Sequence, residues 1–101
     1  EALTNIIKNA IEHSKNNSNI IINIENNNVY SMIEVIDFGE GIAKKDIKHI
    51  FERFYRGKNT KTDSIGIGLA LAKTIIEEDK GTISVESNKL ETKFIVKYYK
   101  I

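Results

Sequence analysis

The chain has 101 residues, of which 41% are hydrophobic and 29% charged, and 15 basic side chains nearly balance 14 acidic ones to leave a net charge of +1. This composition predicts a single soluble globular domain, and it argues against capture of nucleic acid or anionic lipid by charge alone. The absence of cysteine excludes disulfides and thiolate metal sites, and no apolar run reaches membrane-spanning length.

The first predicted element is an amphipathic helix from Glu1 to Ser14. Asn5 and Asn9 share a face of this helix, although asparagine is a poor residue for a helix interior because its side chain competes for backbone hydrogen bonds. Since the pattern is already helical at the first residue, we expect the chain to be a piece of a longer protein. A buried stripe is predicted for the apolar residues at helical spacing, namely Leu3, Ile6, Ile7, Ala10 and Ile11.

A β-hairpin is predicted after a polar connection at residues 15–19. Its strands are Ile20–Glu25, with Ile20, Ile22 and Ile24 on one face, and Val29–Ile36. The turn at residues 26–28 is asparagine-rich, and asparagine tolerates left-handed backbone conformations. The second strand ends on Asp37 and opens into a loop containing Gly39 and Gly41. Because glycine has no Cβ, this loop can turn sharply and let a flat ligand lie close to its backbone.

The rest of the chain predicts a short helix, a polar loop, a longer helix and a closing hairpin. Asp46 is placed to cap the short helix. The side chains of that helix expected to face inward are Ile47, Ile50, Phe51 and Phe54. Residues 57–65 are predicted to form a mobile loop, and the longer helix opens at residues 64–69 and ends near Gly81. Its inward residues are predicted to be Leu69, Ala72, Ile75 and Ile76, and strands at 82–87 and 93–99 follow.

Four features could carry chemistry. Asp37 could accept a hydrogen bond from an adenine amino group, although Asp-x-Gly-x-Gly also occurs in ordinary turns. The amide oxygens of Asn5 and Asn9 suit Mg²⁺ that is held mostly by phosphates and water, or they are simply solvated.

The other two features could bind phosphate. Gly66-x-Gly68 opens a helix, and the free backbone N–H groups at a helix start bind phosphate, although a tight helix entry has the same pattern. Arg56 could hold phosphate oxygens bidentately, or it is an exposed arginine.

Together these residues resemble the N, G1, F and G2 boxes of the catalytic, ATP-binding domain of bacterial sensor histidine kinases. The matching segments, in the family's order, are Asn5-x-x-x-Asn9-Ala, Asp37-x-Gly-x-Gly, Phe51-x-x-Phe54-Tyr-Arg56 and Gly66-x-Gly68-Leu. The resemblance extends from residue 1 to about 97. It implies an α+β fold of the Bergerat (GHKL) type, a two-layer α/β sandwich. The mixed, mostly antiparallel sheet would be covered by helices on one face. Residues 1–101 would form one such domain that lacks its first strand and the start of its helix.

The resemblance also implies ATP and Mg²⁺ as ligands. Asn9 would bind the metal, Asn5 and Arg56 would act on the metal and the phosphates, and Asp37 would bind the adenine amino group. The remaining residues implied to bind the nucleotide, some of them in a lid over it, are Gly39, Gly41, Ile42, Phe51, Phe54, Tyr55, Lys58, Lys61, Gly66, Gly68 and Leu69.

Kinases of this family pass the γ-phosphoryl group of ATP to a histidine on a separate dimeric helical domain, chiefly through positioning and charge neutralisation. The implied partners are therefore the dimerisation and phosphoacceptor domain of the same parent protein and, downstream, a response regulator. Contact with nucleic acid or with the membrane itself is not implied. The expected location is cytoplasmic, as part of a membrane-anchored sensor. Neither His13 nor His49 fits the acceptor, because the family's acceptor segment includes a proline and this chain has none.

The chain departs from the family pattern at several positions. Glu12 and His13 stand where the family usually has a lysine and an aromatic residue, so Lys58 or Lys61 would have to supply the lost phosphate contact. The loop at 57–65 is shorter than the family norm, and Asp63 or Ser64 replaces the first glycine of the G2 box.

Three rival functions share the fold. ATPases of the topoisomerase, mismatch-repair and chaperone kind place a glutamate where Asn5 stands, and an amide cannot deprotonate the attacking water. Asn5 therefore favours phosphoryl transfer over hydrolysis. An anti-sigma-factor serine kinase and a degenerate nucleotide-binding module that only docks a partner are the two alternatives left open.

Overall fold

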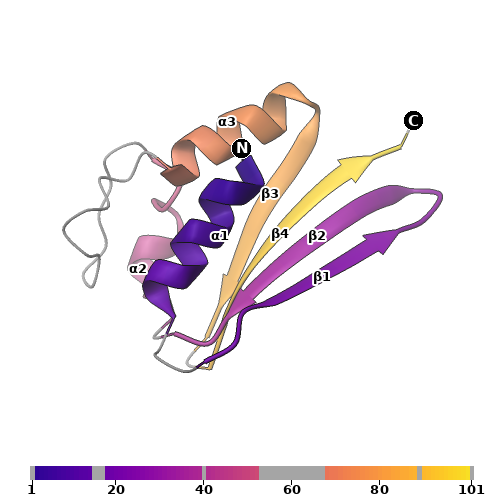
Figure 1. Cartoon of the computed structure of the whole chain (residues 1–101). Helices are drawn as coiled ribbons and strands as arrows, with labels where there is room; N and C mark the ends of the chain where they lie inside the picture. The colour runs from indigo at the N-terminus through magenta and orange to yellow at the C-terminus, as the bar shows by residue number, and fades with distance from the viewer. Residues whose placement is uncertain (1, 15–17, 40, 53–67, 89, 101) are drawn as a thin grey trace.

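The computed structural model describes residues 2–14, 18–39, 41–52, 68–88 and 90–100. The described elements are α1 (Ala2–His13), β1 (Ile21–Asn26), β2 (Tyr30–Asp37), α2 (Lys44–Ile47), α3 (Gly68–Glu78), β3 (Gly81–Ser87) and β4 (Thr92–Tyr99). The strands form one sheet in the order β1-β2-β4-β3, and each pairing is antiparallel. The helices lie on one face of this sheet (Figure 1). The predicted two-layer α+β architecture is therefore confirmed, with only antiparallel pairings among the described strands.

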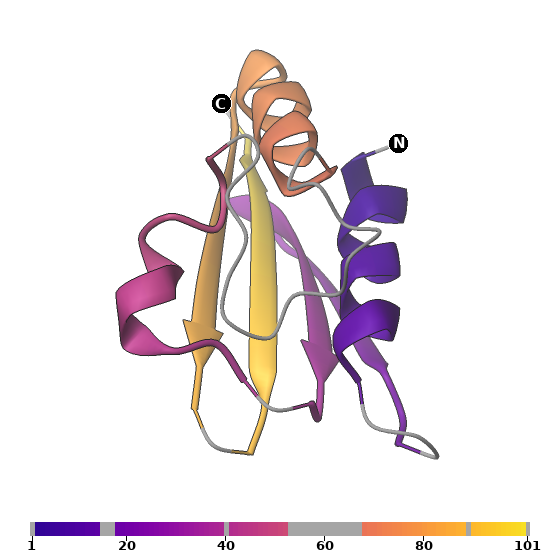
Figure 2. The same ribbon diagram turned by 90° about the vertical axis from the view of Figure 1, so that its left-hand side faces the viewer.

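The core lies between the sheet and the two longer helices. Residues alternate along each strand, so the inward face of β2 and β4 carries the apolar side chains that α1 and α3 cover. The buried members of this core cluster are Ala2, Ile6, Ala10, Val35, Ala72, Ile76, Phe94 and Val96. Figure 2 looks onto the helical layer, with α1 on the β2 side of the sheet and α2 beside β3. None of the described helices is long and apolar enough to cross a bilayer.

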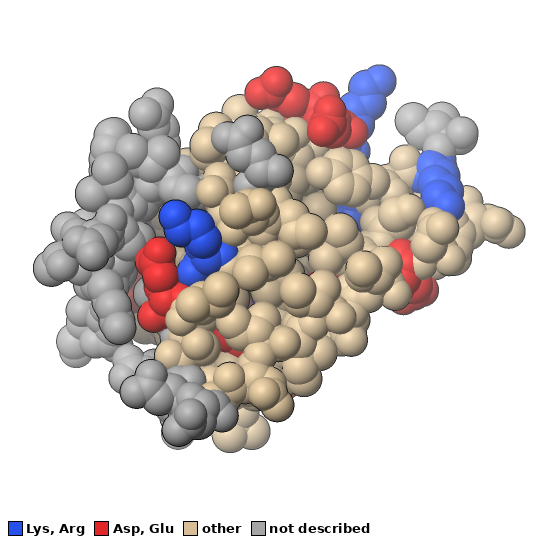
Figure 3. All heavy atoms as spheres, viewed as in Figure 1, with Lys and Arg blue, Asp and Glu red and all other residues tan. Residues whose placement is uncertain are grey.

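Helix α1 buries a narrower stripe than its sequence predicts. Ile6 and Ala10 are buried, but Leu3 is 37% exposed and Ile11 is 57% exposed. The reason is that α1 packs against α3 and β2, whereas all six residues of β1 are exposed. The prediction that Leu3 and Ile11 are buried is therefore wrong. In Figure 3 one basic and one acidic side chain are visible over α1, and much of the surface between α1 and the β1–β2 hairpin carries no charged side chain.

Both described hairpin turns are built on an asparagine side chain. Asn27 Oδ1 accepts hydrogen bonds from the backbone N–H groups of Val29 at 2.8 Å and Tyr30 at 2.9 Å. Asn88 Oδ1 likewise accepts from the N–H groups of Leu90 at 2.7 Å and Glu91 at 3.0 Å. Asparagine closes these turns as a side-chain acceptor. The left-handed conformation proposed for the first turn is absent, because among the described residues a positive φ occurs only at Gly41 and Lys80.

Helix α2 does not have the predicted cap. It begins at Lys44, its N-cap residue is Ala43, and that cap makes no side-chain hydrogen bond. Asp46 instead lies within the helix and is buried. The start of the helix is formed by the Ala43 carbonyl, which accepts from the N–H groups of Asp46 at 2.9 Å and Ile47 at 3.1 Å. Ile47, Ile50 and Phe51 are half-buried, as predicted for the inward face of this segment.

Helix α3 has the predicted inward face and ends before Gly81. Ala72 and Ile76 are buried, and Leu69 and Ile75 pack against the core. The helix is followed by Lys80 in the left-handed region, with φ 65°. Gly81 then lies beneath the ring of Tyr98, where an added Cβ would come within 2.7 Å of a ring carbon. Tyr98 therefore covers the junction between α3 and β3.

Burial and, second, the negative charge of Asp79 raise the pKa of the Tyr98 phenol above its ordinary value of 10.0. The folded state thus keeps this proton at pH values where the unfolded chain has lost it, so Tyr98 makes stability fall as the pH rises from 10.0 towards the raised pKa. We expect Tyr98→Phe to lessen this alkaline loss of stability. Urea unfolding of both proteins at neutral pH and at a series of alkaline pH values measures it, and parallel pH dependences would contradict the assignment.

Candidate functional site

A row of three polar side chains lies at one end of the inner face of the sheet, next to the buried apolar core. Asp37 pairs with Thr92 across β2 and β4, and Thr92 pairs with Ser87 across β4 and β3. Residues paired in this way project from the same face of a sheet. Asp37 is 2% exposed and Thr92 is 3% exposed. The Ser87 and Thr92 hydroxyl oxygens are 2.8 Å apart and share a hydrogen bond.

The loop that follows β2 is tied to this row at both of its ends. The Gly39 N–H donates to Asp37 Oδ1 at 3.0 Å. The Ile42 N–H donates to Ser87 Oγ at 2.8 Å. The chain therefore crosses the end of the sheet from β2 to β3, and it is held over the polar row by one bond to a carboxylate and one to a hydroxyl.

Gly41 is required at its position by both backbone conformation and space. Its φ is +81°, in the region that residues with a Cβ rarely adopt. A Cβ there would also lie 2.5 Å from the Asn88 carbonyl oxygen and 3.1 Å from Ser87 Oγ. The sequence predicts that a flat ligand lies close to the glycine loop; in the structure the close neighbour of Gly41 is the turn between β3 and β4.

Phe51 packs against the hydrophobic core. Its ring meets that of Phe94 edge to face, with centroids 6.3 Å apart and an interplanar angle of 81°. The Lys73 ammonium group lies 5.4 Å from the centroid of the Phe51 ring. Ile42 and Leu69 are partly buried and pack against the same core cluster. Phe51, Ile42 and Leu69, three residues expected at a nucleotide site, therefore pack against the same hydrophobic core.

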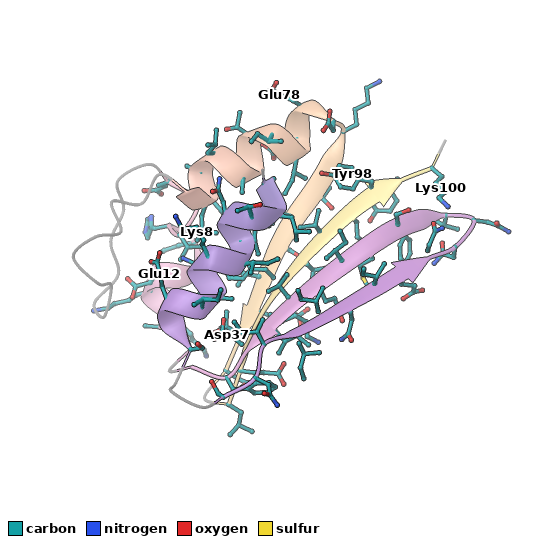
Figure 4. All side chains as sticks on the ribbon, viewed as in Figure 1. Lys8, Glu12, Asp37, Glu78, Tyr98 and Lys100 are labelled. Atoms are coloured by element: carbon teal, nitrogen blue, oxygen red, sulfur yellow. The ribbon has the colours of Figure 1, made fainter. Side chains whose placement is uncertain are left out.

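The two asparagines of α1 are half-buried along one side of the buried stripe of that helix. Helical geometry places Lys8 and Glu12, both exposed, on the same face. Figure 4 shows these two side chains on α1, and it shows Asp37 at the end of the sheet that the C-terminal end of α1 approaches. The amides of Asn5 and Asn9 thus lie along a helix that leads toward the polar row.

Within the described part of the chain, no group of three or more His, Asp or Glu side chains could hold a metal ion. On the face of α1 that carries Asn5 and Asn9, a divalent cation would find neutral amide oxygens, and a bound molecule and water would supply most of its other oxygen ligands. This donor set fits Mg²⁺, which keeps several waters and is often bound together with substrate phosphates.

Several residues singled out in the sequence lie outside the described residues. These are Phe54, Tyr55, Arg56, Lys58, Lys61, Asp63, Ser64 and Gly66. Gly68 is described only as the first residue of α3. His49 is described, and its Nδ1 lies 2.6 Å from Glu52 Oε2 in a local side-chain contact.

Sequence reasoning missed Ser87 and Thr92. Ser87 is the last residue of β3 and Thr92 is the first residue of β4. The nearby inward positions on these strands are apolar, so a hydroxyl at the end of the row is the one signal that the sequence offers. The hydrogen bond from Ile42 to Ser87 joins residues 45 positions apart, and only the strand register places them together.

Comparison with known proteins places the chain in a protein family. A family model described as "Histidine kinase-, DNA gyrase B-, and HSP90-like ATPase" matches residues 1–100. The chain belongs to this family. The sequence resemblance to the histidine kinase branch agrees with this result.

Curated relatives of the chain include sensor kinases. The chain is 38% identical over 87 residues to the sensor histidine kinase YvrG of Bacillus subtilis, an alignment that covers 84% of this chain and 15% of YvrG. It is 40% identical over 88 residues to the heme sensor protein HssS of Staphylococcus haemolyticus, an alignment that covers 87% of this chain and 19% of HssS. The chain therefore spans about a fifth or less of the length of these relatives.

A solved structure similar to this one is the mycobacterial sensor histidine kinase MprB, with a TM-score of 0.87 at 21% identity. The match covers 97% of this chain and 69% of the MprB chain. At this level of identity the likeness concerns the fold. It agrees with the two-layer arrangement of helices on an antiparallel sheet.

Membership of this ATPase family makes ATP the ligand to seek, and the described residues contain two places to consider. One is a cavity of about 40 Å³ lined by Ala2, Leu3, Ile6, Ile33, Ile76, Val96 and Tyr98. It is far too small for a nucleotide, and its lining is almost wholly apolar. The polar row with its glycine loop is the better candidate for the nucleotide site.

Gly41→Ala is expected to displace the loop, because alanine would be strained at φ +81° and would collide with the Asn88 carbonyl. We expect a loss of about 1–3 kcal/mol in the free energy of unfolding together with weaker ATP binding. Urea unfolding and calorimetric titration with ATP measure the two effects. If both stability and affinity were unchanged, the close approach of the loop to the β3–β4 turn would be refuted.

Proposed function

We propose that this chain is the ATP-binding catalytic domain of a two-component sensor histidine kinase and that residues 1–101 form one such domain. It would transfer the γ-phosphoryl group of ATP to a histidine on a separate dimerisation domain of the same parent protein, and a response regulator would act downstream. The observation that carries the proposal is buried Asp37, which anchors a glycine loop at the sheet end. The family match and the two relatives, named as a sensor histidine kinase and a heme sensor protein, support it. Because ATP is the substrate, the domain would act on the cytoplasmic side.

Asp37 would select adenine because its carboxylate accepts hydrogen bonds and cannot donate them. An ionised carboxylate only accepts hydrogen bonds and offers about four lone-pair positions. The Gly39 N–H uses one of them. A second would accept from the exocyclic amino group of adenine, whereas a carbonyl oxygen at the same place on another base would face the carboxylate unfavourably. Gly39, Gly41 and Ile42 would form the wall against which the base lies.

The phosphates and their cation would run from the adenine toward α1 and the start of α3. Asn9 would bind Mg²⁺ and Asn5 would help to hold the metal and the phosphates, which accords with their half-buried positions on one helix face. The backbone N–H groups at Gly68 and Leu69 begin an 11-residue helix, and such groups favour an anion. By sequence resemblance, Gly66, Arg56, Lys58 and Lys61 would add contacts to the phosphates, and Phe51, Phe54 and Tyr55 would hold the lid.

Catalysis at this site would depend on placement more than on acid–base chemistry. Asn5 has an amide where a hydrolytic relative would have a carboxylate, so it cannot activate water for attack on the γ-phosphate. The neighbouring groups would instead hold the terminal phosphate in line with the incoming histidine nitrogen and neutralise its charge as the bond to the leaving ADP breaks. Magnesium, when bound, would supply much of that neutralisation.

Transfer to a supplied helical acceptor domain tests the proposal. The chain is incubated with ATP labelled at the γ-phosphate, Mg²⁺ and the acceptor domain of a sensor histidine kinase. We expect acid-labile label on the acceptor, as for phosphohistidine, and none on the chain itself. Acid-stable label on a serine substrate would point instead to a serine kinase, and ATP binding without any transfer would point to a docking module.

Asp37→Asn is expected to weaken ATP binding while it leaves the fold intact. The single oxygen of asparagine can still accept from the Gly39 N–H, but the group beside it becomes a donor and cannot accept from adenine. Loss of a hydrogen bond to a charged group corresponds to a roughly 10- to 100-fold rise in Kd.

Calorimetric titration with ATP, accompanied by urea unfolding, measures this change. Glu34→Gln is the matched control, because Glu34 lies on the same strand and makes its side-chain contact with Asn23 on the neighbouring strand. Equal Kd values for the Asp37→Asn and unaltered chains would refute the adenine assignment.

A further inference from the structure

We propose that the Ser87 hydroxyl is a positioning group for nucleotide binding, because it holds the far end of the glycine loop in the shape that receives the base. This inference rests on the proposed function, which places adenine beside Asp37. Ser87 lies outside the four sequence segments quoted for the family resemblance, and it is the last residue of β3, before the turn to β4. It would touch the loop rather than the nucleotide.

The hydrogen-bond geometry assigns a direction to the contact. The Ile42 N–H can only donate, so Ser87 Oγ accepts from it at 2.8 Å. The hydroxyl still has one proton, and its neighbour at 2.8 Å is Thr92 Oγ1. Ser87 can therefore donate to Thr92, which in turn leaves the Thr92 proton for an acceptor in the site. One serine thus holds the loop and shares a hydrogen bond with the next hydroxyl in the polar row.

The Ser87–Ile42 hydrogen bond is the second of two contacts that hold the loop, one at each end. The carboxylate of Asp37 fixes Gly39, and Ser87 fixes Ile42. Between them, Gly41 passes so close to the β3–β4 turn that no side chain fits. If Ser87 lost its hydroxyl, the partly buried Ile42 N–H would lose its partner and the far half of the loop would be released. A nucleotide would then have to order this segment when it binds, which lowers affinity.

A positioning role predicts a specific pattern across substitutions at this residue. Ser87→Ala and Ser87→Val remove the hydroxyl, whereas Ser87→Thr keeps it and suits a strand. Threonine and valine have nearly the same shape, so their comparison isolates the hydroxyl. Ser84→Ala is the control on the same strand, since Ser84 is exposed and lies on the opposite face of the sheet.

The experiment measures Kd for ATP and for ADP by calorimetry, together with hydrogen exchange at the Ile42 amide. We expect Ser87→Ala and Ser87→Val to raise both Kd values about tenfold and by the same factor, because the loop holds the adenine end that the two nucleotides share. Exchange at Ile42 should become faster. Ser87→Thr and Ser84→Ala should resemble the unaltered chain in both Kd values and in exchange at Ile42.

Each other outcome has one meaning. Binding of ATP by the Ser87→Ala and Ser87→Val chains as tightly as by the unaltered chain would overturn this inference and leave the proposed function standing. Failure of Ser87→Ala to fold, or equal weakening by threonine and valine, would make Ser87 a structural residue and would overturn it too. If the unaltered chain bound no ATP at all, the proposed function would fail first, and this inference would fail with it.

Discussion

The hydrogen bond between Asp37 and the Gly39 N–H is the interaction on which the rest of the site depends. A buried carboxylate at the end of a strand needs polar partners, since its transfer from water into an apolar environment is costly. Here the chain supplies one partner from its own next turn. That turn starts the loop, and the loop then reaches Ser87 two strands away in the sheet. The shape of the loop therefore depends on the Asp37 carboxylate.

The fold keeps this polar end separate from its apolar body. Phe94 and Val35 are buried immediately next to the polar row on β4 and β2. They anchor the strands, so the register that aligns Asp37, Thr92 and Ser87 cannot slip by one residue without turning the apolar side chains outward. Phe51 adds a further fixed point by packing its ring edge against Phe94. A rigid core of this kind can hold a loop in one conformation ready for a ligand.

Much of this arrangement can be read from the sequence because it depends on local pattern. Apolar periodicity predicts both longer helices and the strands, and the position of Asp37 before two glycines predicts a loop at the strand end. The extent of burial on α1 cannot be obtained in this way, since Leu3 and Ile11 are exposed only because α1 covers β2 and not β1. The predicted Asp46 cap is wrong because the helix starts three residues earlier, with Ala43 at its N-cap. Ser87 requires a cross-strand register that no local pattern encodes.

The central claim is that the Asp37 carboxylate recognises the exocyclic amino group of adenine. Inosine triphosphate carries a carbonyl oxygen where ATP carries that amino group, so the two nucleotides differ at the proposed contact. The most direct measurement is the ratio of their Kd values for the unaltered chain with Mg²⁺. The account predicts that ATP binds at least about tenfold more tightly, as expected for a hydrogen bond to a charged acceptor. Equal affinities for ATP and inosine triphosphate would contradict it.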